Sequence, residues 1–73
     1  MIPEAGKTYD INHRRKGKFR VAVSRVDDVW VNGTLVDGSP HNISMTAAKA
    51  HVGDPMTLRI EFCEFEEIEG QDK

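Results

Sequence analysis

One cysteine and three histidines are the side chains of this 73-residue chain best suited to nucleophilic or metal chemistry. A catalytic thiol needs a base within hydrogen-bond reach and an oxyanion pocket, and a zinc site needs ligands at close spacings such as CxxC or HxxxH. Neither pattern surrounds Cys63, and the histidines are scattered at His13, His41 and His51. The sequence therefore predicts no catalytic residue, no metal site and no cofactor.

Positive charge is concentrated in the stretch NHRRKGKFR at residues 12–20, which holds five of the ten Lys and Arg residues. Such side chains can neutralise phosphates without reading a base sequence, or contact the acidic patch of a protein partner. The alternative is a solvated hairpin tip whose charges discourage edge-to-edge strand pairing. The candidate contact residues of this basic cluster are His13, Arg14, Arg15, Lys16, Lys18 and Arg20.

Acidic and apolar residues are interleaved in the stretch EFEEIEGQD at residues 64–72. Apolar residues inside an acidic rim can anchor an interface, although such runs also occur as solvated chain ends. The single tryptophan is expected to point outward if Val31 and Leu35 point inward on the same strand, and exposed tryptophans anchor interfaces. The alternative is a second small core around this ring, with Phe65 as its neighbour. The predicted partner-binding residues are Trp30, Glu64, Phe65, Glu66 and Glu67.

The elements that must position these side chains follow from the alternation of apolar and polar residues. The composition, 38% hydrophobic and 30% charged, is that of a folded domain, and the length allows one thin core. The alternation places the basic cluster at the tip of the first hairpin. Period-two patterns predict strands over 7–12, 18–26, 29–36 and 55–65.

The middle of the chain is less regular. Asn32-Gly33 is a favoured pair for a two-residue hairpin turn, but a turn here would leave strands of about three residues on each side. We therefore prefer a continuous strand with a bulge or kink at Gly33. Residues 42–45 are expected to form a short strand and 46–53 one or two helical turns.

The last predicted strand loses its phase near its end. Phe65 does not fit the alternation, which predicts either a bulge near Cys63 or a separate apolar contact of Phe65 with Ile68. Beyond this point residues 69–73 are expected to fray, so a single domain is predicted over 1–68.

Four or five short strands, tight turns and one helical turn predict an all-β domain, a small antiparallel SH3-like barrel, with a five-stranded OB barrel as the alternative. A barrel of this size leaves little room for a deep cleft that excludes water, so we expect a binding protein and not an enzyme. The expected core consists of Tyr9, Ile11, Phe19, Val21, Val23, Val31, Leu35, Met56, Leu58, Ile60 and Phe62.

Composition also bounds compartment and partner. One cysteine allows no intrachain disulfide, and no apolar run has the length of a signal-peptide core or a membrane span. These features indicate a cytoplasmic protein that does not bind membranes. The net charge of −2 favours a protein partner over nucleic acid, because nucleic-acid binders are usually strongly basic. The exposed edge strands of a small barrel also allow a homodimer.

Three stretches, GKTYDINHRRKGKFRV (6–21), WVNGTLVDG (30–38) and VGDPMTLR (52–59), together resemble a group of small, largely uncharacterised accessory proteins of tailed bacteriophages. They cover about half of the chain. The chain departs from the group at Arg14, where a small residue is expected, and over 39–51. The resemblance implies a phage or prophage accessory role and brings no active site. More loosely, the strand pattern is similar to KOW-type and other SH3-like modules, which bind RNA or proteins.

The resemblance implies, as a first hypothesis, a non-enzymatic protein that inhibits a host protein complex in the bacterial cytoplasm. Anti-defence proteins of the anti-CRISPR kind and host-takeover proteins act in this way. The residues themselves support a compact binding module with two opposed charge clusters, which would act by steric or electrostatic competition. The alternative hypothesis is an RNA- or DNA-binding module that grips phosphate through the basic loop at 13–20.

Overall fold

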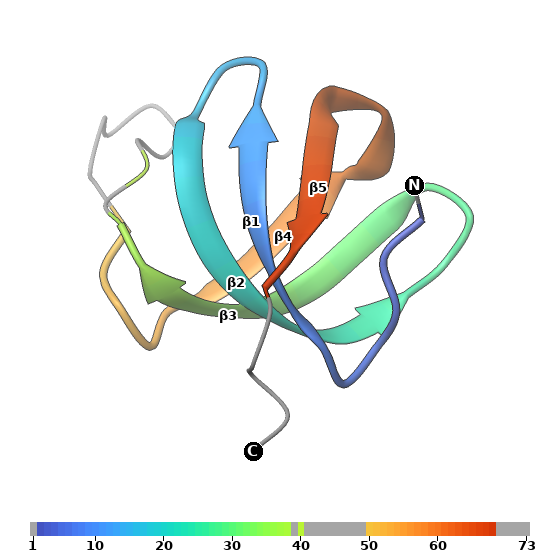
Figure 1. Ribbon diagram of the computed structural model, residues 1–73, viewed down its shortest axis with the longest axis horizontal. Helices are drawn as coiled ribbons and strands as arrows, with labels where there is room; N and C mark the ends of the chain where they lie inside the picture. The colour runs from blue at the N-terminus through green and yellow to red at the C-terminus, as the bar shows by residue number, and fades with distance from the viewer. Residues whose placement is uncertain (1, 39, 41–49, 69–73) are drawn as a thin grey trace.

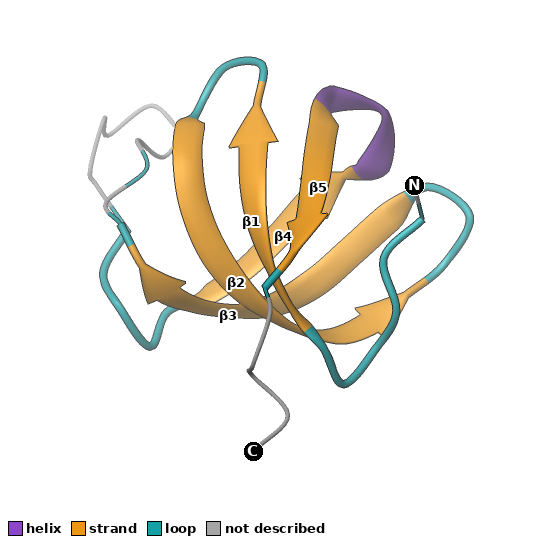
Figure 2. Cartoon of the chain, viewed as in Figure 1, coloured by secondary structure: helices purple, strands orange, loops and turns teal. Residues whose placement is uncertain are grey.

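The computed structural model describes residues 2–38, 40 and 50–68, and its strands form one curved antiparallel sheet (Figures 1 and 2). The strand order in the sheet is β4-β3-β2-β1-β5. This confirms the predicted fold class, a small and mainly β antiparallel domain with one short helical turn. The elements are β1 (Thr8–His13), β2 (Gly17–Val26), β3 (Trp30–Asp37), β4 (Pro55–Arg59), the 3-10 turn η1 (Ile60–Phe62) and β5 (Cys63–Glu67).

The first two strands form the predicted hairpin because their apolar residues alternate in the same phase. Tyr9 pairs with Val21 and Ile11 pairs with Phe19, and all four side chains are buried. Gly17 follows the tip with a φ of 83°, a left-handed conformation that favours glycine. The basic cluster therefore lies at the tip of this hairpin and on the strand that leaves it.

The third strand is continuous, so Asn32-Gly33 is not a hairpin turn, as the strand lengths predicted. The expected irregularity lies on the opposite strand. Val23 pairs with Gly33 and Arg25 pairs with Asn32, which leaves Ser24 of β2 as the extra residue. The bulge therefore bends β2, and Gly33 keeps a regular place opposite it.

The prediction of one strand over 55–65 is wrong, because η1 divides this segment into β4 and β5. Two backbone hydrogen bonds from distant segments hold the interruption. The Ile60 N–H donates to the Val29 carbonyl at 2.9 Å, and the Arg14 N–H donates to the Phe62 carbonyl at 3.0 Å. The break is larger than the predicted bulge, and it redirects the chain so that β5 pairs with β1.

Three predictions concern residues that lie wholly or partly outside the described ranges: the short strand at 42–45, the frayed tail at 69–73 and the helical turns at 46–53. Of the segment 46–53 the structure describes residues 50–53, which contain a turn and no helix. The His51 N–H donates to the Asp54 carboxylate, and the Asp54 N–H donates to the His51 carbonyl, each at 2.9 Å.

The core fills the inside of the curved sheet. Ile60 and Phe62, predicted in the core, are only partly buried because η1 breaks the alternation of β4. Within the described ranges, no helix has the length and apolar character needed to cross a membrane. The buried hydrophobic residues are Tyr9, Ile11, Phe19, Val21, Val23, Val31, Leu35, Ala50, Met56 and Leu58.

Candidate binding surface

Arginine and aromatic side chains alternate in a row at the end of the domain where η1 lies. The guanidinium carbon of Arg14 is 5.7 Å from the centre of the Phe62 ring. The guanidinium carbon of Arg59 is 5.7 Å from the centres of both the Phe62 and Trp30 rings. Guanidinium groups are attracted to aromatic faces at such distances. We call the row Arg14, Phe62, Arg59 and Trp30 the arginine–aromatic ladder.

The outward direction of Trp30 follows from strand alternation. Val31 is buried in the core, so Trp30 faces the other side of β3, opposite Arg59 of β4, and 41% of its surface is exposed. The turn before it is fixed by Asp27, whose Oδ1 accepts hydrogen bonds from the N–H groups of Val29 at 2.9 Å and Trp30 at 2.7 Å. These two bonds lower the pKa of Asp27, so the turn is held by a carboxylate at neutral pH.

The 3-10 turn is attached on both sides. Figure 1 shows η1 near the tip of the β1–β2 hairpin, and the Arg14 to Phe62 backbone bond joins them. On its other side, the Ile60 to Val29 bond joins η1 to the β2–β3 turn. The ladder therefore crosses three chain segments whose backbones are hydrogen-bonded to one another.

A buried histidine holds the hairpin tip. His13 is 4% exposed, and its Nδ1 accepts hydrogen bonds from the N–H groups of Arg15 at 3.1 Å and Lys16 at 3.2 Å. Its ring meets the Phe62 ring edge-on, with 6.0 Å between ring centres. The structure therefore places His13 inside the fold and not among the exposed residues of the basic cluster, because this residue continues the inward alternation of β1. Its neighbours Arg14 and Arg15 are exposed at the tip.

Acid is expected to destabilise the fold through His13. Burial, followed by the positive charges of Lys16 and Arg15, lowers the pKa of His13 below its usual 6.5. The unfolded chain takes up this proton near pH 6.5 and the folded chain only at lower pH, so the free energy of unfolding falls as the pH drops from 6.5 through the folded pKa. Urea unfolding between about pH 8 and 5 measures this, with His13→Asn expected to show a flatter pH dependence. Equal slopes for the two proteins would contradict the assignment.

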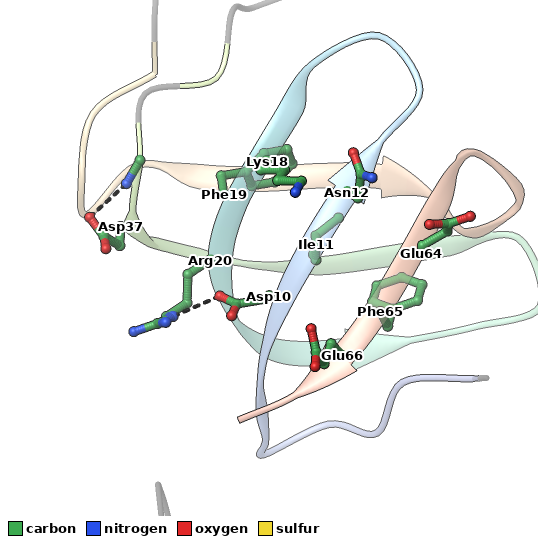
Figure 3. A pocket seen from close by; sticks show the side chains of 11 residues that line it. Asp10, Ile11, Asn12, Lys18, Phe19, Arg20, Asp37, Glu64, Phe65 and Glu66 are labelled. Carbon is green, nitrogen blue, oxygen red and sulfur yellow. Dashed lines mark hydrogen bonds and ion pairs between the residues drawn. The ribbon is translucent and has the colours of Figure 1, made fainter. Parts of the chain in front are cut away.

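The strand β1 lies between the acidic strand β5 and the strand β2, so acidic side chains of β5 and basic side chains of β2 flank it. On the outward face a base on β2 and an acid on β5 flank one residue of β1 (Figure 3). The Arg20 Nε donates to the Asp10 Oδ1 at 2.9 Å, and charges of both signs line a hollow of about 670 Å³ over this face. The two cross-strand rows are Lys18–Asn12–Glu64 and Arg20–Asp10–Glu66.

The predicted partner-binding residues are not gathered in one place. Phe65 packs edge-on against the buried Tyr9, with 5.8 Å between ring centres, and therefore is not the neighbour of Trp30. Glu67 forms an ion pair with Lys7 at 3.2 Å, and Glu64 and Glu66 line the hollow. Of this group, only the tryptophan belongs to the ladder.

The predicted basic cluster is divided in a similar way. Arg14 belongs to the ladder, Arg15 and Lys16 lie at the tip beside it, and Lys18 and Arg20 face the acidic strand. The ladder therefore has a basic end at the hairpin tip. Arg15 and Lys16 at the tip extend its positive charge, whereas the bases of β2 line the hollow together with acidic side chains.

Sequence reasoning missed Arg59 and Phe62 as candidate binding residues. The alternation of the last predicted strand places Arg59 on the outward face, and the structure confirms this. Its contact with Trp30 depends on the register between β3 and β4, and no local motif specifies that register. Phe62 lies outside the core because η1 interrupts the strand alternation, and η1 is held by backbone hydrogen bonds to distant segments.

The other groups that could carry chemistry are the side chains that bind metals and the thiol of Cys63. In the described part of the chain, no three His, Cys, Asp or Glu side chains are placed to hold a metal ion. Cys63 donates to the Arg59 carbonyl at 3.3 Å, and burial raises its pKa to about 11, so it is a thiol and not a nucleophilic thiolate at neutral pH. Comparison of the chain with protein-family models, with curated proteins and with solved structures found no match.

Proposed function

We propose that the protein is a non-enzymatic binding module that attaches to a larger protein through the arginine–aromatic ladder. The observation that carries this proposal is an exposed tryptophan stacked with an arginine at one end of a row that is fixed by backbone hydrogen bonds. Tryptophan and arginine are the residue types most enriched among the side chains that dominate protein interfaces. Trp30 and Arg59 are therefore the residues expected to contribute most to binding.

The resemblance to tailed-phage accessory proteins supports a bacterial host complex in the cytoplasm as the partner. In this proposal the protein inhibits that complex by covering a surface that another molecule needs, as an anti-defence or host-takeover protein does. Charge complementarity would accelerate the encounter, and the aromatic contacts would slow release. A homodimer through β5 is disfavoured, because antiparallel pairing of two such strands places Glu64, Glu66 and Glu67 close to the same acids.

A nucleic-acid-binding module is the second candidate, and one observation favours it. The ladder provides exposed ring surface at Trp30 and cationic groups at Arg14 and Arg15, the combination that single-stranded nucleic acids use for stacking and phosphate contacts. The net charge of −2 opposes it, because a polyanion is repelled at long range by an acidic protein.

A pull-down with matched variants tests the proposed function. The full chain is immobilised and exposed to bacterial lysate with and without nuclease treatment, and the captured proteins are quantified by mass spectrometry. We expect a host protein that the wild type and the control Lys18→Ala both retain, and that Trp30→Ala retains roughly tenfold less, because the tryptophan anchors the contact. Capture that is equal for all three proteins would overturn the proposal. Capture that nuclease treatment abolishes would favour the nucleic-acid candidate.

A further inference from the structure

We propose that the ladder recognises an acidic peptide segment with an apolar anchor. In this complex carboxylates of the partner sit on Arg14 and Arg59, and a large apolar side chain covers Trp30 and Val29. The inference rests on the proposed function and names the chemistry of its partner. It follows from the distribution of charge and apolar surface along the ladder.

The apolar end of the ladder lies at the β2–β3 turn. Val29 and Trp30 are consecutive, and each is 41% exposed although both are large hydrophobic residues. The Asp27 carboxylate fixes both backbone N–H groups, so the two side chains leave a turn of defined shape. An apolar side chain of a partner would remove both from water, which is the main favourable term in association.

The basic end lies at the hairpin tip. Arg14 is exposed while its guanidinium stacks on Phe62, and Arg15 is exposed beside it. An arginine stacked by its face can still donate hydrogen bonds from its edge to a carboxylate, which pairs with guanidinium in a fork geometry. This end therefore suits acidic side chains of a partner.

The structure already contains a carboxylate paired with Arg59, the arginine that lies over both rings of the ladder. Glu61 Oε2 is 2.7 Å from Arg59 Nη2, while the same guanidinium lies over the Trp30 and Phe62 rings. The side chains of Arg59 and Glu61 are 44% and 58% exposed, so this ion pair is open to exchange with an outside group. Glu61 therefore shows where a carboxylate of the partner would sit, and it competes with that carboxylate.

A peptide fits this row better than a nucleic acid does. A nucleic acid carries a phosphate at every nucleotide, so a strand running along the ladder would place negative charge near the Asp27-Asp28 turn next to Trp30. A peptide can place acidic residues on the arginines and an apolar residue at the turn. The separation of charge along the ladder therefore favours a protein segment.

Fluorescence titrations of the full chain test the inference. The probe is a fluorescein-labelled synthetic peptide with a leucine pair followed by glutamates, and affinity is measured by its anisotropy. The emission of Trp30, the single tryptophan, reports whether the peptide reaches the ladder. We expect saturable binding that weakens as salt is added, together with a shift in tryptophan emission. Saturable binding without any change in emission would overturn the proposed location.

Variants of Arg59 and of its ion-pair partner Glu61 make the test more specific. Glu61→Gln is expected to tighten peptide binding several-fold, because it removes the internal competitor, and Arg59→Ala to weaken it roughly tenfold. Arg20→Ala is the matched control, since Arg20 also pairs with a carboxylate at 2.9 Å but lies on the hollow. Equal losses for the two arginine variants would show that general charge governs binding, and would overturn the inference. Circular dichroism confirms that each variant is folded.

Two further arms separate this inference from the proposed function. A labelled single-stranded oligonucleotide that binds while the acidic peptide does not would overturn the inference in favour of nucleic acid. If the peptide fails but the pull-down partner still depends on Trp30, the ladder is a protein-binding surface and the acidic-segment inference alone is wrong. Peptide binding that depends on Arg59, with tightening by Glu61→Gln, supports both.

Discussion

Gly33→Val is expected to leave the protein unfolded, and Gly33→Ala to remove about 3 kcal/mol of its free energy of unfolding. A β-carbon at Gly33 would lie 2.3 Å from the Ala22 carbonyl oxygen and 2.6 Å from the Val21 Cγ1. The carbonyl belongs to the β2 backbone and cannot move without disturbing the β2–β3 pairing. Domains of this size have only about 5 kcal/mol of stability in total, so this loss is large.

Urea unfolding followed by circular dichroism measures the effect, with Gly17→Ala as the control. Gly17 has a φ of 83°, and within the described ranges no atom beyond its chain neighbours lies within 4 Å of an added β-carbon. Its substitution therefore costs only the left-handed backbone strain, about 1 to 2 kcal/mol. A smaller loss for Gly33→Ala than for Gly17→Ala would show that β2 can yield.

Tyr9→Ala is expected to lower the free energy of unfolding by about 4 kcal/mol. The side chain is 2% exposed, and its ring packs against Phe65 of β5. Its hydroxyl accepts a hydrogen bond from the Glu4 N–H at 2.8 Å, so one residue joins the N-terminal segment, β1 and the acidic strand. Removing the ring leaves a cavity where these three segments meet.

Tyr9→Phe separates the ring from the hydroxyl. It keeps the packing against Phe65 and removes only the hydrogen bond, so a loss of about 1 kcal/mol is expected in the same urea experiment. A loss for Tyr9→Phe close to that for Tyr9→Ala would mean that the hydrogen bond to the N-terminal segment, and not the packing of the ring, supplies most of the stability that Tyr9 contributes.

Most of the fold is predictable from the sequence because strand alternation is a local property. The first hairpin is predicted from the spacing of four apolar residues alone, and the structure pairs Tyr9 with Val21 and Ile11 with Phe19. The same rule fails at 60–62, where the apolar alternation continues but the strand does not. There, hydrogen bonds to segments far away in the chain outweigh the local pattern, and such contacts leave no trace in spacing.

The ladder is less predictable than the fold. The outward direction of Trp30 follows from the burial of Val31, and His13 could have been placed inside by extending the phase of β1. The stacking of Arg59 between two rings combines a strand register with the position of η1, and neither is a local property. Charge clusters along a sequence therefore indicate which residue types are available, and the topology decides which of them meet.

The two hydrogen bonds that attach η1 to its flanking segments have an energetic consequence for the proposed recognition of a partner. Because they join the hairpin tip, η1 and the β2–β3 turn before any partner arrives, the backbone beneath the ladder is already preorganised. Association then forfeits little conformational entropy on this side of the interface, and more of the contact energy remains as affinity. A small domain can in this way hold a partner firmly with a short row of side chains.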